Sequence, residues 1–182
     1  MRSVVTVMRC VLAALVGAGT LATAQDQIMG IGLAGAVRES GWIPLQVRLA
    51  STGVAREVEV IGLGVTPDGD VLHTPQRVGV PPSSDVEVSI LALPAPNATQ
   101  VEVLIKDQGT TVRLVAPMPA RIPTASTVVL CVGSIPNGLG QLRDPDPRVR
   151  AFTSRVEVNS LVDLNAIPSD WRALDVADVL VL

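Results

Sequence analysis

The stretch QVEVLIKDQGTTVRLVA, residues 100–116, decides the fold of the first part of this chain. Apolar and polar residues alternate on both sides of a short polar segment, which is the period of a strand buried on one face. The segment is Asp107-Gln108-Gly109, and its glycine can adopt the positive φ that a tight turn requires. The stretch therefore predicts a β-hairpin made of residues 100–106 and 110–116.

The same alternation continues on the N-terminal side of this hairpin. It is clearest in residues 43–49, 57–60 and 85–90, and turn-forming residues stand at 51–53, 67–69 and 81–84. About six or seven short strands with turns every 8–12 residues are typical of an immunoglobulin-like or fibronectin III-like β-sandwich. The sequence therefore predicts a mainly β protein with a sandwich domain at residues 25–117.

The alternation ends in the segment PMPARIPTAST, residues 117–127, and residues 118–126 are interpreted as a linker between domains. The continuous apolar run at 128–132 then predicts a strand buried on both faces of a parallel sheet.

Further elements are expected after this run. They are a short helix at 147–154, a strand at 155–158, a helical turn at 168–171 that starts near Ser169, and a strand at 176–182. This order predicts that residues 127–182 form the first part of a Rossmann-like α/β domain. Three strands are too few to bury the core of such a domain, so the domain is expected to be incomplete at Leu182 and the chain to be a fragment.

Residues 1–24 have the pattern of an export signal. Arg2 and Arg9 provide a positive start, residues 11–18 an apolar middle, and Ala22-Thr23-Ala24 a small-residue cleavage site. We therefore expect a signal peptide at 1–24, with Ala22, Ala24 and Gln25 marking the cleavage site and Gln25 beginning the mature chain. This places the protein in the periplasm, the cell envelope or the extracellular space.

The composition agrees with a folded exported protein. Hydrophobic residues make up 48% of the chain and charged residues 17%, which is enough apolar material for a core. Loss of the two signal arginines lowers the formal net charge from −3 to about −5, which argues against nucleic acid as a partner. No later apolar run reaches the roughly 20 residues of a membrane span, so membrane anchoring would need a missing C-terminal segment.

Candidate reactive residues are few. Cys131 is the single cysteine of the mature chain and is interpreted as a small buried hydrophobe, and His73 as a surface residue. The pairs Asp68/Asp70 and Asp144/Asp146 fit turn chemistry better than a calcium site. Trp42 is expected in the core, and Trp171 against the α/β sheet or at a contact between the domains. The sequence thus predicts no catalytic residue, no cofactor and no metal site.

Two motifs carry a resemblance to a known group. They are GWIPLQV at 41–47, and IPSDWRALD at 167–175 followed by DVLVL at 178–182. The chain resembles exported planctomycete-type bacterial proteins that place a β-sandwich before a class I glutamine amidotransferase-like α/β domain. The resemblance implies that the nucleophilic cysteine of such a domain would follow a later strand, and Cys131 does not match that position.

Three functional hypotheses follow. The first is a non-catalytic binding or scaffold module of the cell envelope, with envelope proteins or peptides as partners. It is preferred over an enzyme because the sequence has no catalytic constellation, and the choice stays open. The alternative is the N-terminal fragment of an amidotransferase-like or peptidase-like hydrolase whose catalytic residues lie beyond residue 182. The third is a sandwich that adds an extended peptide to an exposed sheet edge near Arg113.

Overall fold

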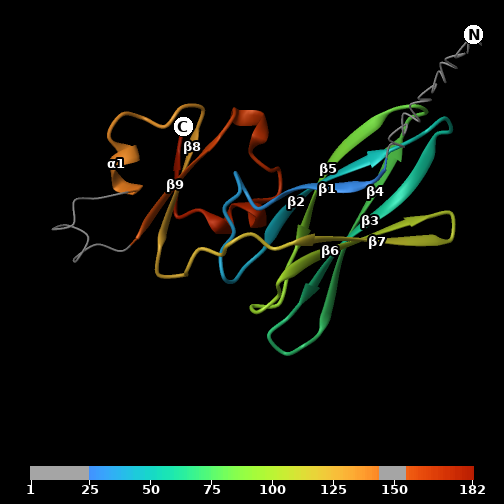
Figure 1. Ribbon diagram of the computed structural model, residues 1–182, viewed down its shortest axis with the longest axis horizontal. Coiled ribbons are helices and arrows are strands. Elements are labelled where there is room, and N and C mark those ends of the chain that lie inside the picture. The colour runs from blue at the N-terminus through green and yellow to red at the C-terminus, as the bar shows by residue number, and fades with distance from the viewer. Residues whose placement is uncertain (1–24, 144–154) are drawn as a thin grey trace, which may run out of the picture.

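The computed structural model describes residues 25–143 and 155–182, and it is mainly β (Figure 1). The expected signal peptide at 1–24 and the expected helix at 147–154 lie outside the described residues, as do Asp144 and Asp146. Residues 25–117 form seven strands, which agrees with the predicted number of six or seven. They are β1 (Gln27–Ile31), β2 (Ile43–Ala50), β3 (Arg56–Val65), β4 (Val71–Val80), β5 (Asp85–Ala92), β6 (Gln100–Asp107) and β7 (Thr110–Pro117).

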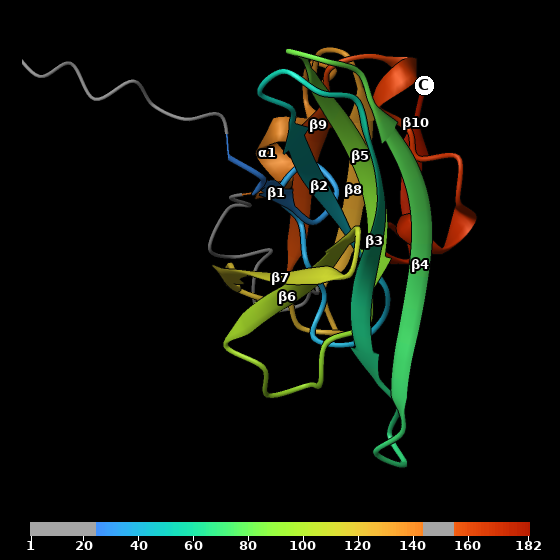
Figure 2. The same ribbon diagram turned by 90° about the vertical axis from the view of Figure 1, so that its right-hand side faces the viewer.

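These seven strands form two antiparallel sheets. One sheet has the order β1-β2-β5 and the other the order β4-β3-β6-β7, so β4 and β7 lie at opposite flanks of the second sheet (Figure 2). One apolar cluster takes side chains from both sheets, which therefore pack face to face. This arrangement is compatible with a β-sandwich.

The core follows the alternation of the sequence. Fully buried side chains from the first sheet meet fully buried side chains from the second, and each large one contributes about 1.5–3 kcal/mol of burial free energy. They include Leu45, Val47 and Leu49 of β2, Val58 and Val60 of β3, and Val101, Val103 and Ile105 of β6. Their polar neighbours in sequence point away from this core.

The predicted hairpin is confirmed. β6 and β7 pair in regular register from Gln100 opposite Pro117 to Asp107 opposite Thr110. Gln108 and Gly109 form the two-residue loop, with φ values of 43° and 88°. Two successive positive φ angles produce the turn whose twist matches that of the flanking strands.

Backbone hydrogen bonds join the two sheets at one corner, where β3 passes close to β5. A Cβ atom on Gly62 would lie 2.0 Å from the carbonyl oxygen of Leu91 and 2.6 Å from Oγ1 of Thr74. Two residues further on, backbone hydrogen bonds join Val65 N to Leu93 O and Leu93 N to Leu63 O, at 2.8 and 3.2 Å. Gly62 is therefore required because a side chain there would collide with the backbone of the opposite sheet.

A third sheet follows in the described part of the chain, and it is parallel, as the apolar run at 128–132 predicted. Its order is β10-β8-β9, from β8 (Thr127–Val132), β9 (Val156–Leu161) and β10 (Val179–Val181). The same region contains the short helix α1 (Leu139–Arg143) and the 3₁₀-helices η1 (Leu164–Ala166) and η2 (Trp171–Val176). The helix α1 had not been predicted.

The third predicted strand began too early. Val176 ends η2 and does not begin β10, because its side chain is buried among Leu33, Val128 and Leu161. The helical turn itself begins after Asp170, whose carboxylate accepts the backbone N–H of Arg172 and so caps the helix in place of Ser169.

A tight turn of the first region, residues 25–117, supplies part of the core of the second region, residues 127–143 and 155–182. Leu33 and Ala36 are joined by two backbone hydrogen bonds of 3.1 and 2.9 Å, and both side chains are buried. They pack with Val128 and Leu130 of β8, and the sheet β10-β8-β9 consequently lies beside the two antiparallel sheets (Figure 1).

The side chain of Arg38 stabilises this contact between the two regions. Its Nε donates to the carbonyl of Val176 at 2.9 Å, and its Nη1 donates to the carbonyls of Thr124 and Ser126, each at 3.3 Å. Its Nη2 forms an ion pair with Asp178, whose carboxylate also accepts the N–H of Val128 at 2.7 Å. One guanidinium thus holds two separate segments, residues 124–126 and 176–178, against the first region.

The expected linker, residues 118–126, is hydrogen-bonded to the first region. Ile122 N donates to Val37 O at 2.7 Å, and Glu39 N donates to Ile122 O at 3.1 Å. Arg121 donates to several backbone carbonyls, including those of Ala95 and Ala98 at 2.9 and 3.0 Å. The segment therefore holds the two regions in a defined arrangement.

The close approach at Gly62 is testable by adding one methyl group. Gly62→Ala should lower the free energy of unfolding by about 1–3 kcal/mol, because the opposing carbonyl belongs to a packed backbone. Gly79→Ala in β4 is the matched control: a Cβ there meets nothing within 4 Å, so stability should stay equal or rise slightly. Urea unfolding of both variants measures the difference, and equal destabilisation would contradict the steric argument.

Arg38→Ala tests the contact between the two regions. We expect faster amide hydrogen exchange in β8 and β10. The free energy of unfolding should fall by about 1–3 kcal/mol, because hydrogen bonds to a charged group are removed. Arg48→Ala is the control, since it removes only the exposed ion pair with Glu87 and should change stability by less than about 1 kcal/mol. Unchanged exchange in β8 and β10 of the Arg38 variant would show that the apolar contact alone suffices.

Candidate functional site

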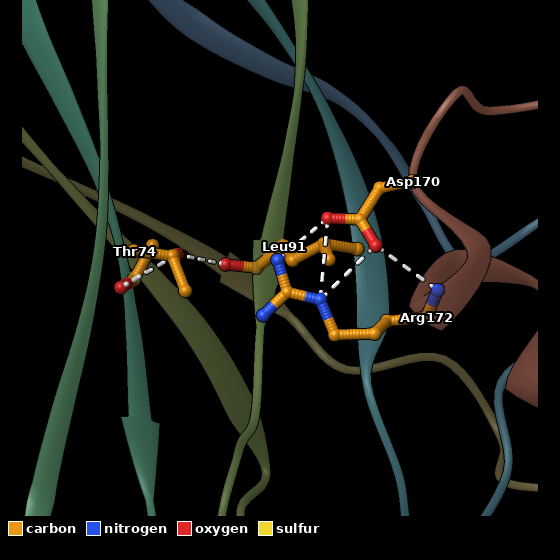
Figure 3. Close-up of polar contacts among 5 residues, drawn as sticks. Thr74, Leu91, Asp170 and Arg172 are labelled. Carbon is orange, nitrogen blue, oxygen red and sulfur yellow. Dashed lines mark hydrogen bonds and ion pairs between the residues drawn. The ribbon is translucent and has the colours of Figure 1, made fainter.

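One candidate surface is a cleft between the corner of the two antiparallel sheets and the start of η2. It measures about 280 Å³ and is lined by residues 74–76 of β4, residues 89–91 of β5 and residues 168–170, 172 and 173. On one wall the Thr74 hydroxyl contacts the carbonyl oxygens of Leu91 and Gly62, the latter at 3.2 Å (Figure 3). This wall is therefore fixed by the same close approach that requires glycine at position 62.

The other wall of the cleft carries an ion pair. Arg172 donates from Nε and Nη2 to the carboxylate of Asp170, at 3.0 and 2.6 Å (Figure 3). The hydrogen bond from Arg172 holds the pKa of Asp170 below its ordinary value, and the same bond raises the pKa of Arg172. The guanidinium also lies over the ring of Trp42, 4.8 Å from its centroid.

These charged groups of the cleft satisfy one another. Asp170 and Arg172 neutralise each other, and the face of Trp42 that Arg172 covers is closed to a ligand. The cleft therefore functions best as a contact between the two regions. Trp42 was predicted to be a core residue, but it is half-buried at this contact, and Trp171 is 72% exposed, so its predicted packing against the sheet is wrong.

The other candidate residues lie apart from one another. Cys131 is buried within β8 against Val129 and Val158, as predicted, and His73 is exposed on β4, also as predicted. Asp68 and Asp70 are exposed in a turn in which Asp70 N donates to Thr66 Oγ1 at 3.0 Å. Within residues 25–143 and 155–182, no group of three or more His, Cys, Asp or Glu side chains is placed to hold a metal ion.

A second candidate surface is the outer edge of β7. This strand pairs with β6 on one side, and within the described residues no strand pairs with its other side. Because Asp107 and Thr110 flank a two-residue loop, they exchange backbone hydrogen bonds, and the pattern then alternates along the strand. The backbone groups of Thr111, Arg113 and Val115 consequently point outward.

The other outer strands of the two antiparallel sheets are less able to accept a partner. Pro75 interrupts β4 opposite Ile61, and a proline in an edge strand removes a donor from the outward side. The chain directly after β5 is joined to β3 at the Leu93–Gly64 bridge, and β1 is short with an irregular register at Ile28 and Gly30. β7 is longer than β1 and, unlike β4, has no proline before its last residue, Pro117.

A hollow of about 550 Å³ lies beside β7. Val112 and Leu114 of β7 form one wall, and the chain before β1 together with the loop after β2 forms the other, including Gln25, Asp26 and Val54. Val112 is 44% exposed and Val54 79% exposed, so apolar surface faces solvent here. β1 and β7 touch elsewhere along their length, so the hollow is a gap between the edges of the two sheets.

Two charged residues that line this hollow, Asp26 and Arg56, form a cluster with a third, Asp107. Arg56 forms ion pairs with Asp26 and with Asp107, the latter at 3.2 Å, and Asp26 also accepts the N–H of Ala50 at 2.9 Å. Burial would lower the pKa of Arg56, but the hydrogen bonds and charges of the two carboxylates outweigh it and raise that pKa. The Nε atom of Arg56 is buried without a hydrogen-bond partner.

The sequence contained part of this information. Alternation and the turn at 107–109 predicted β7, and Arg113 was expected at a sheet edge. The hollow beside β7 was not predicted. The triad of Arg56, Asp26 and Asp107 joins residues far apart in sequence, so no local pattern could indicate it.

Comparison with known proteins adds one similarity. Residues 29–117 match a family described as a domain of unknown function (DUF8726), which covers the two antiparallel sheets from within β1 to the end of β7. No curated protein matches the sequence. In the described residues, no helix is long and apolar enough to cross a membrane.

The edge of β7 predicts an alternating pattern of amide hydrogen exchange. Amides of the even-numbered residues 110–116 should exchange slowly, because they are bonded to β6, and those of residues 111, 113 and 115 rapidly, because they face solvent. Residue-resolved exchange measured by NMR checks this pattern. Slow exchange at residues 111, 113 and 115 in the isolated protein would show that this edge is already occupied.

Proposed function

We propose that this chain is a non-catalytic binding module of an exported envelope protein, which captures an extended polypeptide segment at the outer edge of β7. The observation that carries the proposal is the row of outward backbone groups on a regular eight-residue edge strand. An added strand would form main-chain hydrogen bonds there, and this kind of recognition is independent of the sequence of the captured segment.

The hollow beside β7 supports the same proposal. Side chains of an added strand alternate between the two faces of the sheet, so every second one would point into the gap between β7 and β1. The apolar surface of Val112 and Val54 would then be covered, which favours binding through the hydrophobic effect. Main-chain bonds would provide the attachment and the hollow would provide the selectivity.

Export and the domain type are parts of this proposal. The signal pattern of residues 1–24 supports secretion, with cleavage after Ala24. Two residues later, Asp26 already contacts the sandwich, because it bonds to Ala50 and Arg56. The face-to-face sheets support an immunoglobulin-like or fibronectin III-like sandwich. Envelope proteins or peptides are the proposed partners.

A second candidate function rests on the parallel sheet β10-β8-β9. Parallel strands with both faces of β8 buried support the opening of a Rossmann-like, amidotransferase-like α/β domain. In this proposal the chain is the N-terminal part of a hydrolase whose catalytic residues follow residue 182. The β7 edge would then serve to position a polypeptide substrate.

Replacement of Arg113 by proline tests capture at β7. Arg113→Pro removes one outward N–H but no hydrogen bond to β6, so the fold should be preserved. Peptides selected from a display library should bind the variant at least tenfold more weakly, which corresponds to about 1.4 kcal/mol. Arg113→Ala is the matched control: it removes the same ion pair with Glu102 but keeps the N–H, and it should bind as the original chain does. Fluorescence anisotropy measures affinity and circular dichroism the fold; equal binding by the proline variant contradicts the proposal.

A further inference from the structure

The charges around the hollow restrict what can bind at β7. Arg56 is shared between Asp26 and Asp107, so the three side chains together carry one excess negative charge. Asp26 is the more enclosed of the two carboxylates, with 12% of its side chain exposed, and it also accepts the backbone N–H of Ala50. Asp107 is 27% exposed, so it is the carboxylate that an incoming group can reach more easily.

The position of Asp107 relates this charge to the edge strand. Asp107 ends β6 directly before the hairpin loop, and its cross-strand partner Thr110 begins β7. The next loop residue, Gln108, lines the hollow. The excess negative charge therefore lies at the hairpin end of β7, whereas Val112 and Leu114 place apolar surface further along the strand.

We infer that the segment captured at β7 alternates apolar with polar residues and carries a lysine or arginine at the hairpin end, where it pairs with Asp107. This inference rests on the proposed function and names the chemistry of the partner. Apolar side chains at every second position fill the hollow against Val112 and Val54. The basic group neutralises the charge that Arg56 leaves uncompensated, and an acidic group at the same place would be repelled.

Two labelled peptides of about ten residues, the upper end of ordinary strand length, test the inference. In both, valine alternates with serine, and two lysines or two glutamates stand at each end. We expect the lysine peptide to bind about fivefold more tightly at low salt, because a partly exposed ion pair replaces a repulsion. The preference should shrink as salt screens the charges.

Two isosteric variants locate the effect. Asp107→Asn should reduce the preference below about twofold, because it removes the charge at the hairpin end. Asp68→Asn makes the same change in net charge at an exposed turn elsewhere and should leave the preference intact. Thermal unfolding of each variant checks that the hairpin persists. Loss of the preference to the same extent in both variants would mean that only overall charge matters, and it would overturn the inference.

The remaining outcomes separate the inference from the function on which it rests. Equal binding of both peptides, abolished by Arg113→Pro, would refute the basic partner but leave capture at β7 standing. Failure of both peptides and of the display library to yield any binder would refute capture itself. Protection of the amides of residues 111, 113 and 115 by the lysine peptide, and weaker protection by the glutamate peptide, would support both.

Discussion

The burial of alternate side chains between two antiparallel sheets is the constraint on which the rest of this structure depends. Because side chains of a strand point to opposite faces in turn, a shift of β7 by one residue would move Leu114 out of the core. The register of β6 and β7 is therefore fixed, and so is the direction of every backbone N–H in β7. The direction of the outward backbone groups at this edge is therefore a consequence of core packing.

The guanidinium of Arg38 fixes the position of the second region relative to the first. Arg38 donates to carbonyls from segments around Thr124 and Val176, which precede β8 and β10, and to the carboxylate of Asp178. A single residue of the first region thus aligns two parallel strands, while Leu33 and Ala36 supply apolar contacts beside it. The polar bonds set the orientation, and the apolar contacts supply most of the free energy, since they remove apolar surface from water.

Sequence reasoning succeeded where a local rule fixes the structure. Alternation identified β2, β5 and the β6–β7 hairpin, and the continuous apolar run identified β8 as a strand buried on both faces. It did not identify β4, because most of that strand is exposed and Pro75 interrupts its pattern. It also misplaced Trp42, whose environment depends on Arg172, about 130 residues further along the chain. Contacts between distant residues leave no periodic signal in the sequence.

The difference between the two candidate surfaces lies in what their polar groups already bind. In the cleft beside η2, the carboxylate of Asp170 is matched by one guanidinium, which also covers Trp42, so a ligand would have to break existing contacts before making its own. At β7 the outward backbone groups are bonded to no other described strand, and Asp107 shares its guanidinium with Asp26. Backbone groups in water lose little when they exchange water for an added strand, and the hollow adds apolar burial. Binding is therefore favoured at the strand edge, and the cleft is better suited to holding the two regions together.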